Sequence, residues 1–238
     1  MIELYTIPTG IPDNIDKDRP VVILDIFRAS TSITAALAAG AEKILVAGSM
    51  AEAEKLKSAA DSVPVMAGER SGFRIEGYDL GNSPREMLPD NVSGKTVIFN
   101  STNGTKLLRR FDHFETVIVG SFVSMMATVD YLSRFENDPV VCCAGTVGRE
   151  SNEDTLAAGL LISSLDRPES VLDDAAVSAV RLVQNSQGDW VKWARHSFHG
   201  RYLASIDLAE DLDFCLDLDR FHFVPVKSGE VLVRSDRL

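Results

Sequence analysis

An acidic and a basic side chain, Asp25 and Arg28, follow the apolar segment 21–24 within four residues. A carboxylate at the end of a strand can hold Mg²⁺, act as a nucleophile or cap the next helix. Ser30 and Thr31 suit the capping role better, which leaves the acid and the base free to face a cleft. Arg28 could simply pair with Asp25, but an arginine at a helix N-terminus opposes the helix dipole, which favours a bound anion there.

A second acid–base pair, Glu69 and Arg70, follows the apolar segment 63–67. The pair could line the same cleft, or it could be a surface ion pair on a tight turn, which would contribute little to stability. Asn82 lies in a Gly-Asn-Ser-Pro turn signal a few residues later. Its amide could donate to an oxyanion or could serve the turn alone.

The sequence Ser-Thr-Asn-Gly-Thr, from Ser101 to Thr105, ends another apolar segment. Asn103 and Gly104 tolerate a positive φ, so the backbone N–H groups around them can turn toward one point. Because helix-forming residues follow at once, this turn is a candidate anion cradle. An Asn-Gly pair between two strands would instead form a hairpin, which the following helix disfavours.

Glu153 and Asp154 lie in the first turn of a predicted helix, where carboxylates suit the helix dipole without further explanation. Alternatively, one of them completes a metal site together with Asp25 or Glu69. Mg²⁺ is bound in proteins by one or two carboxylates, by waters and by substrate phosphate. Both interpretations carry equal weight from the sequence.

The segment 195–203 holds two histidines and two arginines, which is unusual in a chain with four histidines. His196 and His199 are three residues apart and could share one helical face. A zinc pair would need further ligands, and neither a cysteine nor a third histidine is near, so zinc ranks low. Arg201 in this segment is a candidate ligand for an anionic substrate.

These side chains follow apolar segments that alternate with helical ones. The predicted strands cover residues 21–24, 43–47, 63–67, 95–99, 116–120 and 140–144, and the predicted helices cover 32–39, 49–60, 106–110, 124–135, 152–165 and 173–183. The alternation predicts the α/β class, as a three-layer α/β/α sandwich with a largely parallel, mixed sheet. Residues 1–238 are expected to form one domain, with two interleaved lobes as the alternative, and 224–233 a terminal hairpin. Ligands of such sheets bind beyond the carboxyl ends of the strands.

Composition excludes several classes of protein. The net charge of −11 argues against a nucleic-acid partner, but a small anion remains compatible with a locally built site. No apolar run reaches the roughly 18 residues that a membrane helix needs, and no export signal is evident at the start. The chain is therefore expected to be cytoplasmic, with its three cysteines reduced. It lacks the dinucleotide-binding, P-loop and nucleophile-elbow motifs.

Six fragments occur in one order between about Val21 and about Val226, and together they resemble the 2-phosphosulfolactate phosphatase family: DIFRAST, GER, DLGNSP, STNGT, CAG with the later ED pair, and HGRYL. The resemblance implies a fold of the family's own type. It also implies Mg²⁺-dependent acid phosphatase activity that converts 2-phospho-3-sulfolactate to 3-sulfolactate and phosphate in coenzyme M biosynthesis. The family often has TTNGT where this chain has STNGT, which keeps a hydroxyl. Since the family also occurs where no coenzyme M is made, the resemblance implies a phosphatase of a small acidic phosphoester more firmly than it implies this one substrate.

The resemblance assigns roles to the candidate residues. Mg²⁺ would be held by Asp25 and by one of Glu69, Glu153 or Asp154, and a metal-activated water is favoured over a covalent aspartyl-phosphate. The guanidinium groups of Arg28 and Arg70 would clamp phosphate or sulfonate oxygens. The remaining substrate contacts would come from Asn82, Ser101, Asn103, Gly104, Thr105 and Arg201.

Three alternatives stay open. A haloacid-dehalogenase-type phosphatase would need a second acid two residues after Asp25, where this chain has Phe27. A non-catalytic module could bind a phosphorylated or sulfonated acid without turnover. The acid–base pairs could also be ordinary ion pairs that do not converge in space. A homodimer is expected only because symmetric dimers are the commonest assemblies.

Overall fold

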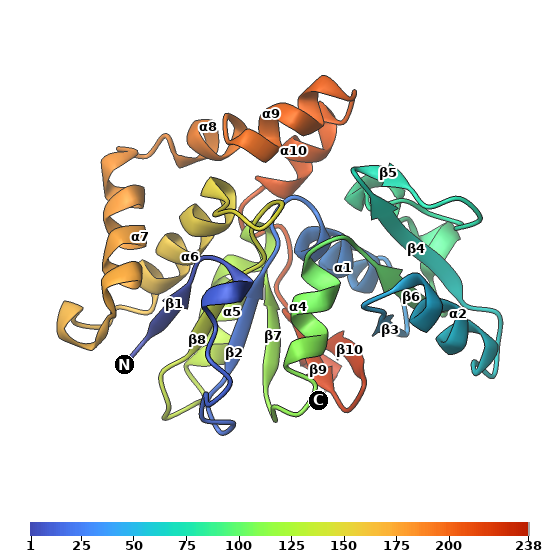
Figure 1. Ribbon diagram of the computed structural model, residues 1–238, viewed down its shortest axis with the longest axis horizontal. Helices are drawn as coiled ribbons and strands as arrows, with labels where there is room; N and C mark the ends of the chain where they lie inside the picture. The colour runs from blue at the N-terminus through green and yellow to red at the C-terminus, as the bar shows by residue number, and fades with distance from the viewer. Residues whose placement is uncertain (238) are drawn as a thin grey trace.

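The computed structural model describes residues 1–237, and its strands form one mixed sheet in the order β1-β8-β2-β7-β9-β10-β3-β6-β4-β5 (Figure 1). The strands are β1 (Glu3–Tyr5), β2 (Val21–Leu24), β3 (Lys43–Val46), β4 (Val65–Arg70), β5 (Phe73–Arg74), β6 (Thr96–Asn100), β7 (Val117–Gly120), β8 (Val140–Cys143), β9 (Pro225–Ser228) and β10 (Val231–Arg234). The predicted α/β class with a largely parallel, mixed sheet is confirmed, while the three-layer arrangement stays a prediction.

The α-helices are α1 (Ala29–Ala38), α2 (Met50–Ser58), α3 (Pro89–Val92), α4 (Gly104–Arg110), α5 (Met125–Leu132), α6 (Asn152–Ser164), α7 (Asp174–Asn185), α8 (Trp190–Arg195), α9 (Phe198–Ser205) and α10 (Ala209–Cys215). Short 3₁₀ helices cover Pro8–Gly10, Pro84–Glu86, Phe122–Ser124, Glu169–Val171 and Ser235–Arg237. No helix within residues 1–237 combines the length and the apolar character that crossing a bilayer requires.

The sheet consists of two parallel halves joined by the antiparallel hairpin β9–β10. One half is β1-β8-β2-β7 and the other contains β3, β6 and β4. The hairpin pairs with the first half through Ile118 and Val226, and with the second through two residue pairs at Ile44–Leu45. The predicted terminal hairpin is thus confirmed, and in Figure 1 it lies at the opposite end of the sheet from α8, α9 and α10.

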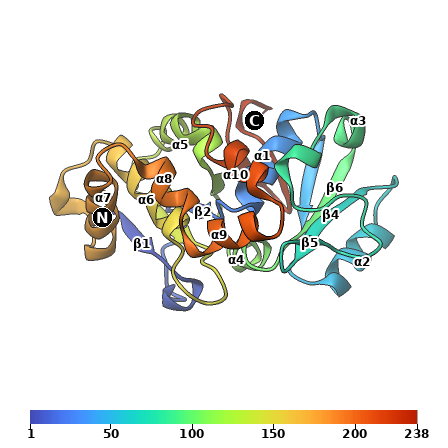
Figure 2. The same cartoon turned by 90° about the horizontal axis from the view of Figure 1, so that it is seen from above.

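Both halves pack against the same central helices, α1 and α4. Side chains of β2 alternate, so Val21 and Ile23 face this central core while Val22 and Leu24 face a second core under α5, α6 and α7. In the other half, Val97 and Phe99 of β6 face the central core. Seen from above, α9 and α10 lie over the region between β2 and β4 (Figure 2). The loops that follow strands of both halves therefore meet beneath these two helices.

Three details differ from the sequence-based predictions. Helix α1 begins at Ala29 instead of Ser32, because Ser30 N–H already bonds to the carbonyl of Asp25. Strand β4 continues through Glu69 and Arg70, which pair with β5, so these residues end a strand and do not form a turn. The helices α8, α9 and α10 were not predicted, because their short lengths leave little periodicity.

The close crossing of α6 and α7 generates a prediction about Gly159. A Cβ added at this glycine would lie 2.2 Å from the carbonyl oxygen of Ala179, so alanine would force the two helices apart. We expect Gly159→Ala to lower the free energy of unfolding in urea by about 1–3 kcal/mol, although alanine favours a helix. Gly10→Ala is the matched control, because its Cβ would meet no heavy atom closer than 4.0 Å. Equal stability of the two variants would contradict the close contact.

Candidate active site

A pocket of about 290 Å³ lies at the edge of the sheet where β2, β4, β6 and β8 end. Five of the residues singled out from the sequence line it together: Asp25, Arg28, Glu69, Asn82 and Asn103. Asp25 follows β2 of one half, whereas Glu69 and Asn103 end or follow strands of the other half. The loops therefore converge as the sequence predicted, and the alternative of scattered ion pairs is wrong for these five residues.

Asp25 is nearly buried and packs directly against the start of α4. A Cβ on Gly104 would lie 2.5 Å from Oδ2 of Asp25 and 3.1 Å from Cβ of Ala29, so only glycine permits this approach. The backbone N–H of Asp25 donates to Oγ of Ser30 at 2.9 Å, which ties the strand end to α1. Burial raises the pKa of Asp25 to about 6, with His199 lowering it and Glu69 raising it further.

Glu69 connects two loops of the second half. Its Oε1 accepts a hydrogen bond from the backbone N–H of Thr102 at 2.7 Å, and its Oε2 accepts one from Gly72 N–H at 2.9 Å. Each carboxylate oxygen has further acceptor capacity, so the same group can fix the loops and also face a ligand in the pocket. This arrangement holds Glu69 in a single orientation next to Asp25.

The guanidinium group of Arg28 is anchored by Asp211 of α10. Its Nη1 lies 2.5 Å from Oδ2 of Asp211, and its Nη2 donates to the carbonyl of Gly72 at 2.8 Å. Ser83 completes the network by donating its hydroxyl to the other Asp211 oxygen at 2.6 Å. Arg28 is therefore paired with Asp211 and not with Asp25, and its remaining N–H groups are free to bind an anion.

Glu153 and Asp154 take different roles in the first turn of α6. Asp154 accepts hydrogen bonds from the backbone N–H groups of Ile26 and Gly145, and so ties together the loops that follow β2 and β8. Burial raises the pKa of Asp154 well above its ordinary value. Neither carboxylate oxygen of Glu153 has a hydrogen-bond partner in the described chain. Nδ1 of His199 lies 3.4 Å from Oε1 of Glu153. Burial raises the pKa of Glu153, but His199, Ser197 and the backbone together bring it below its ordinary value.

Unpartnered buried oxygens gather around the pocket. Oδ1 of Asn82 and Oγ1 of Thr102 both belong to residues that line it, and neither has a partner within residues 1–237. Buried polar atoms are nearly always hydrogen-bonded, and each exception calls for an explanation such as an ion, a water or a ligand. The unpartnered carboxylate of Glu153 lines an adjoining pocket that shares Thr146, Phe198 and His199 with this one.

Several predicted residues lie elsewhere. Arg70 donates to its neighbour's carbonyl and to Asn100, while Arg201 on α9 donates to the carbonyl of His196. Neither arginine lines the pocket. Ser101 and Thr105 are buried and bond to each other at the start of α4.

The turn before α4 differs from its predicted geometry. Asn103 has a φ of −116°, and Gly104 belongs to the first turn of the helix, so no left-handed turn aims backbone N–H groups at one point. Glycine is required here by the approach of Asp25 and not by a positive φ. The predicted positive φ at Asn103 and Gly104 is wrong, because Asn103 is the N-cap of α4 and Gly104 is its first residue.

The four carboxylates predicted as metal ligands do not form one cluster. Among the described residues, no three His, Cys, Asp or Glu side chains are placed so that they could jointly hold a metal ion. Asp154 has both oxygens bound to backbone N–H groups, whereas Asp25 and Glu69 line the pocket. A magnesium ion with one or two protein carboxylates stays a prediction, and these last two are its candidates.

Sequence reasoning missed Asp211 and misjudged His199. His196 and His199 do not share a helical face, because Ser197 caps a new helix by accepting from Gly200 N–H at 3.0 Å. His199 lines the pocket, whereas His196 faces a different one. The local sequence around Asp211 did not mark it as functional, because its partner Arg28 lies 183 positions away along the chain.

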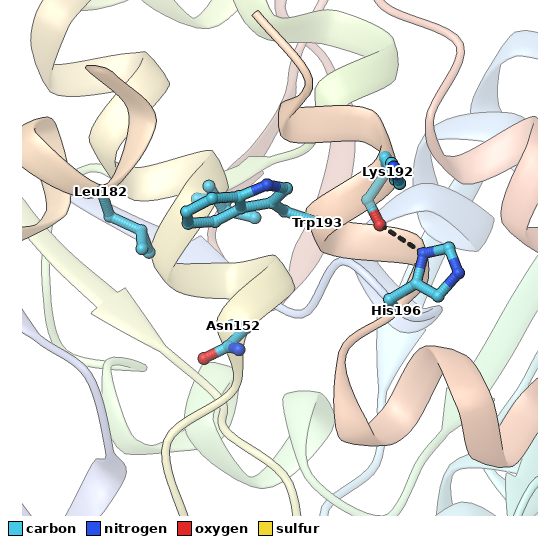
Figure 3. A pocket seen from close by; sticks show the side chains of 6 residues that line it. Asn152, Leu182, Lys192, Trp193 and His196 are labelled. Atoms are coloured by element: carbon cyan, nitrogen blue, oxygen red, sulfur yellow. Dashed lines mark hydrogen bonds between the residues drawn. The ribbon is translucent and has the colours of Figure 1, made fainter. Parts of the chain in front are cut away.

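A second pocket, of about 250 Å³, lies among α6, α7 and α8 (Figure 3). It is lined by Asn152, Leu156, Leu182, Lys192, Trp193 and His196. Nδ1 of His196 lies 2.8 Å from the carbonyl oxygen of Lys192, and this contact closes the last turn of α8 (Figure 3). Apart from His196, which was considered for a zinc pair, none of the residues predicted to do chemistry lines this pocket, so it is not the candidate active site.

The buried Arg28–Asp211 pair generates a prediction about stability. Side-chain exposure is 3% for Arg28 and 1% for Asp211, so Asp211→Asn would leave a buried guanidinium without its counter-charge. We expect a loss of about 3–5 kcal/mol in the free energy of unfolding, measured by urea denaturation. Asp217→Asn is the control, because its pair with Arg220 is half exposed and should contribute only about 0.2–1 kcal/mol. Similar losses in both variants would contradict a special role for the buried pair.

Comparison with known proteins identifies the family of the chain. The sequence model of the family described as 2-phosphosulpholactate phosphatase matches residues 5–230. A protein of Caldanaerobacter subterraneus subsp. tengcongensis is 36% identical over 99% of both chains, and one of Carboxydothermus hydrogenoformans is 38% identical over 93% of both. Each is named a probable 2-phosphosulfolactate phosphatase. The chain belongs to the 2-phosphosulfolactate phosphatase family.

Proposed function

We propose that the protein is a Mg²⁺-dependent phosphatase that hydrolyses 2-phospho-3-sulfolactate, as in coenzyme M biosynthesis, or a related small acidic phosphoester. The observation that carries this proposal is the convergence of Asp25, Arg28 and Glu69 in one pocket, from loops that belong to both halves of the sheet. Carboxylates and a guanidinium group at one point are what a metal ion and a phosphate require.

The donor set fits a magnesium ion. Burial raises the pKa of Asp25, and the nearby Glu69 carboxylate raises it further. The unpartnered Oδ1 of Asn82 adds a neutral oxygen to the same pocket. These three groups would hold the ion. When bound, Mg²⁺ supplies positive charge that offsets the charge of the phosphoryl oxygens.

Arg28 is the residue best placed to hold the phosphate. Two of its five N–H groups are used by Asp211 and by the carbonyl of Gly72, which fixes the plane of the guanidinium. The other N–H groups can donate to phosphate oxygens in that fixed orientation. Holding a substrate in one geometry removes much of the entropic barrier to reaction.

Hydrolysis joins the oxygen of a water to phosphorus and breaks the ester P–O bond. The water loses one proton overall, and the leaving alkoxide gains one to become the hydroxy acid. His199 is the pocket residue suited to move that proton. Because its Nδ1 is near Glu153 and Thr146, Nε2 is the nitrogen left to serve the substrate.

The first test is release of phosphate from 2-phospho-3-sulfolactate and from other small phosphoesters, with Mg²⁺ and with a chelator. We expect turnover with the metal and its loss with the chelator. Binding without turnover would support a non-catalytic module instead. Because protonation of Asp25 competes with the cation, Mg²⁺ affinity measured by calorimetry should fall by up to about tenfold per pH unit below about pH 6. An affinity that does not change between pH 5 and 7.5 would argue against Asp25 as a ligand.

The contact between Gly104 and Asp25 gives a second test. In Gly104→Ala the new Cβ would displace the Asp25 carboxylate, so we expect kcat/KM to fall by about 100-fold, as a misplacement of roughly 1 Å can cause. Gly10→Ala, which adds a Cβ in open space away from the pocket, should keep normal activity. Thermal melting of both variants separates a displaced carboxylate from loss of the fold. Normal kcat/KM in a folded Gly104→Ala variant would contradict the role of Asp25.

A further inference from the structure

Glu153 carries a buried charge that the reaction proposed above does not yet use. Its side chain is 1% exposed, lies in the first turn of α6, and lines the adjoining pocket of about 180 Å³. Neither of its carboxylate oxygens has a hydrogen-bond partner within residues 1–237. A buried carboxylate without partners is costly, so its presence in a native structure calls for a specific reason.

The ion-pair partner of this carboxylate in the described part of the chain is His199, whose Nδ1 lies 3.4 Å from Oε1 of Glu153. Burial raises the pKa of Glu153, but His199, Ser197 and the backbone bring it below its ordinary value, so the carboxylate stays ionised at neutral pH. Asp25 is a second carboxylate near His199, which lowers the pKa of Asp25 as well. Of these two carboxylates, Glu153 is the one that forms an ion pair with the ring within residues 1–237.

The ring of His199 is held in place by its other neighbours too. Phe27 lies edge-on to it with the ring centroids 6.4 Å apart, and Tyr202 lies at the same centroid distance with an angle of 28° between the ring planes. Oγ1 of Thr146 lies 3.4 Å from Nδ1, the same ring nitrogen that faces Glu153. Nδ1 therefore faces protein groups, and Nε2 is the nitrogen available to the pocket that His199 lines.

Hydrolysis of an alkyl phosphoester makes a specific demand on this histidine. When the bond between phosphorus and the ester oxygen breaks, its electron pair stays on that oxygen, which is a poor leaving group unless a proton reaches it. Nε2 can supply that proton and leave a neutral ring only if both ring nitrogens are protonated beforehand. A carboxylate at Nδ1 favours this charged form and determines which nitrogen keeps its proton afterwards. The proton that the attacking water loses then restores the imidazolium.

We propose that Glu153 is a positioning residue that holds His199 as the general acid for the leaving oxygen, with Nδ1 turned to Glu153 and Nε2 to the substrate. This inference rests on the phosphatase reaction proposed above and adds the second member of its proton-transfer pair. The separation of 3.4 Å suits the free enzyme, because catalytic hydrogen bonds are commonly long until the substrate binds. The alternative is a purely structural pair that joins α6 to α9.

The test varies the leaving group on one scaffold, with 2-phospholactate and its 3,3,3-trifluoro analogue as substrates. Fluorine makes the leaving alkoxide less basic, so the analogue depends less on a general acid. We expect Glu153→Gln to lower kcat by about 100-fold for 2-phospholactate but by no more than about tenfold for the trifluoro ester, with KM changed by less than about threefold. A structural pair would lower both kcat values by one factor or leave both unchanged, and either outcome would overturn the inference while the phosphatase function stands.

Two further variants link the effect to the charge of Glu153. Glu150→Gln is the matched control, because Glu150 lines the same adjoining pocket but accepts a hydrogen bond from Thr6 at 2.7 Å, so both esters should keep their kcat. Glu153→Asp keeps the charge, and we expect its ratio of kcat between the two esters to stay within about threefold of the unmodified protein. A ratio changed as much in Glu153→Asp as in Glu153→Gln would show that charge is not the cause and would overturn the inference.

Calorimetry with Mg²⁺ separates the proposed role of Glu153 from that of a metal ligand. The carboxylates proposed to hold the cation are Asp25 and Glu69, which line the main pocket. Glu153→Gln should therefore bind Mg²⁺ with an affinity within about threefold of the unmodified protein. A larger loss of affinity would make Glu153 a metal ligand and would overturn the inference.

Nitrogen NMR of isotope-labelled histidine reads the state of His199 without any turnover. In the Mg²⁺-loaded protein at about pH 7 we expect both ring nitrogens of His199 to be protonated, and in Glu153→Gln a neutral ring. His199→Gln assigns the signal among the four histidines of the chain. A neutral ring in the unmodified protein would overturn the inference. If neither ester is turned over, the phosphatase function fails, and this measurement alone then supports or overturns the pairing.

Discussion

Buried carboxylates at the meeting point of two half-sheets are the constraint on which this structure depends. Asp25, Glu69 and Asp211 are nearly inaccessible, in a chain whose net charge is already −11. A buried charge must be offset by hydrogen bonds or by an opposite charge. Asp211 is offset by Arg28 and Ser83, and Glu69 by two backbone N–H groups. Asp25 accepts a long 3.4 Å bond from Ala29 N–H, and burial raises its pKa to about 6. A cation held by this carboxylate stays a prediction.

The two-part sheet explains why these groups meet. The hairpin β9–β10 joins the halves at one end, while α1 and α4 fill the space between them. The loops after β2 and β6 then approach each other at the other end, and Gly104 lets α4 contact the Asp25 carboxylate. The loops meet at the pocket although β7, β9, β10 and β3 lie between β2 and β6 in the sheet order. The hairpin β9–β10 therefore supports the site from a distance, although none of its residues lines the pocket.

Local patterns predicted the convergence of the loops but not the partners within it. Asp25 and Asn103 could be recognised because each follows an apolar segment at once, and the strands of an α/β sheet place such residues at one edge. The partnership of Arg28 with Asp211 could not, because it joins residues 183 positions apart and no local signal marks it. Arg70 was misplaced for a related reason: its strand continues past Ala67, and a continued strand turns alternate side chains to opposite faces.

Two residues that line the pocket, Val147 and Phe198, adopt a conformation or an exposure that their side chains do not favour. Val147 occupies a turn position that suits asparagine or glycine, and Phe198 begins α9 with most of its side chain in water. Neither choice improves folding, and sites that break local rules without a structural gain are commonly functional.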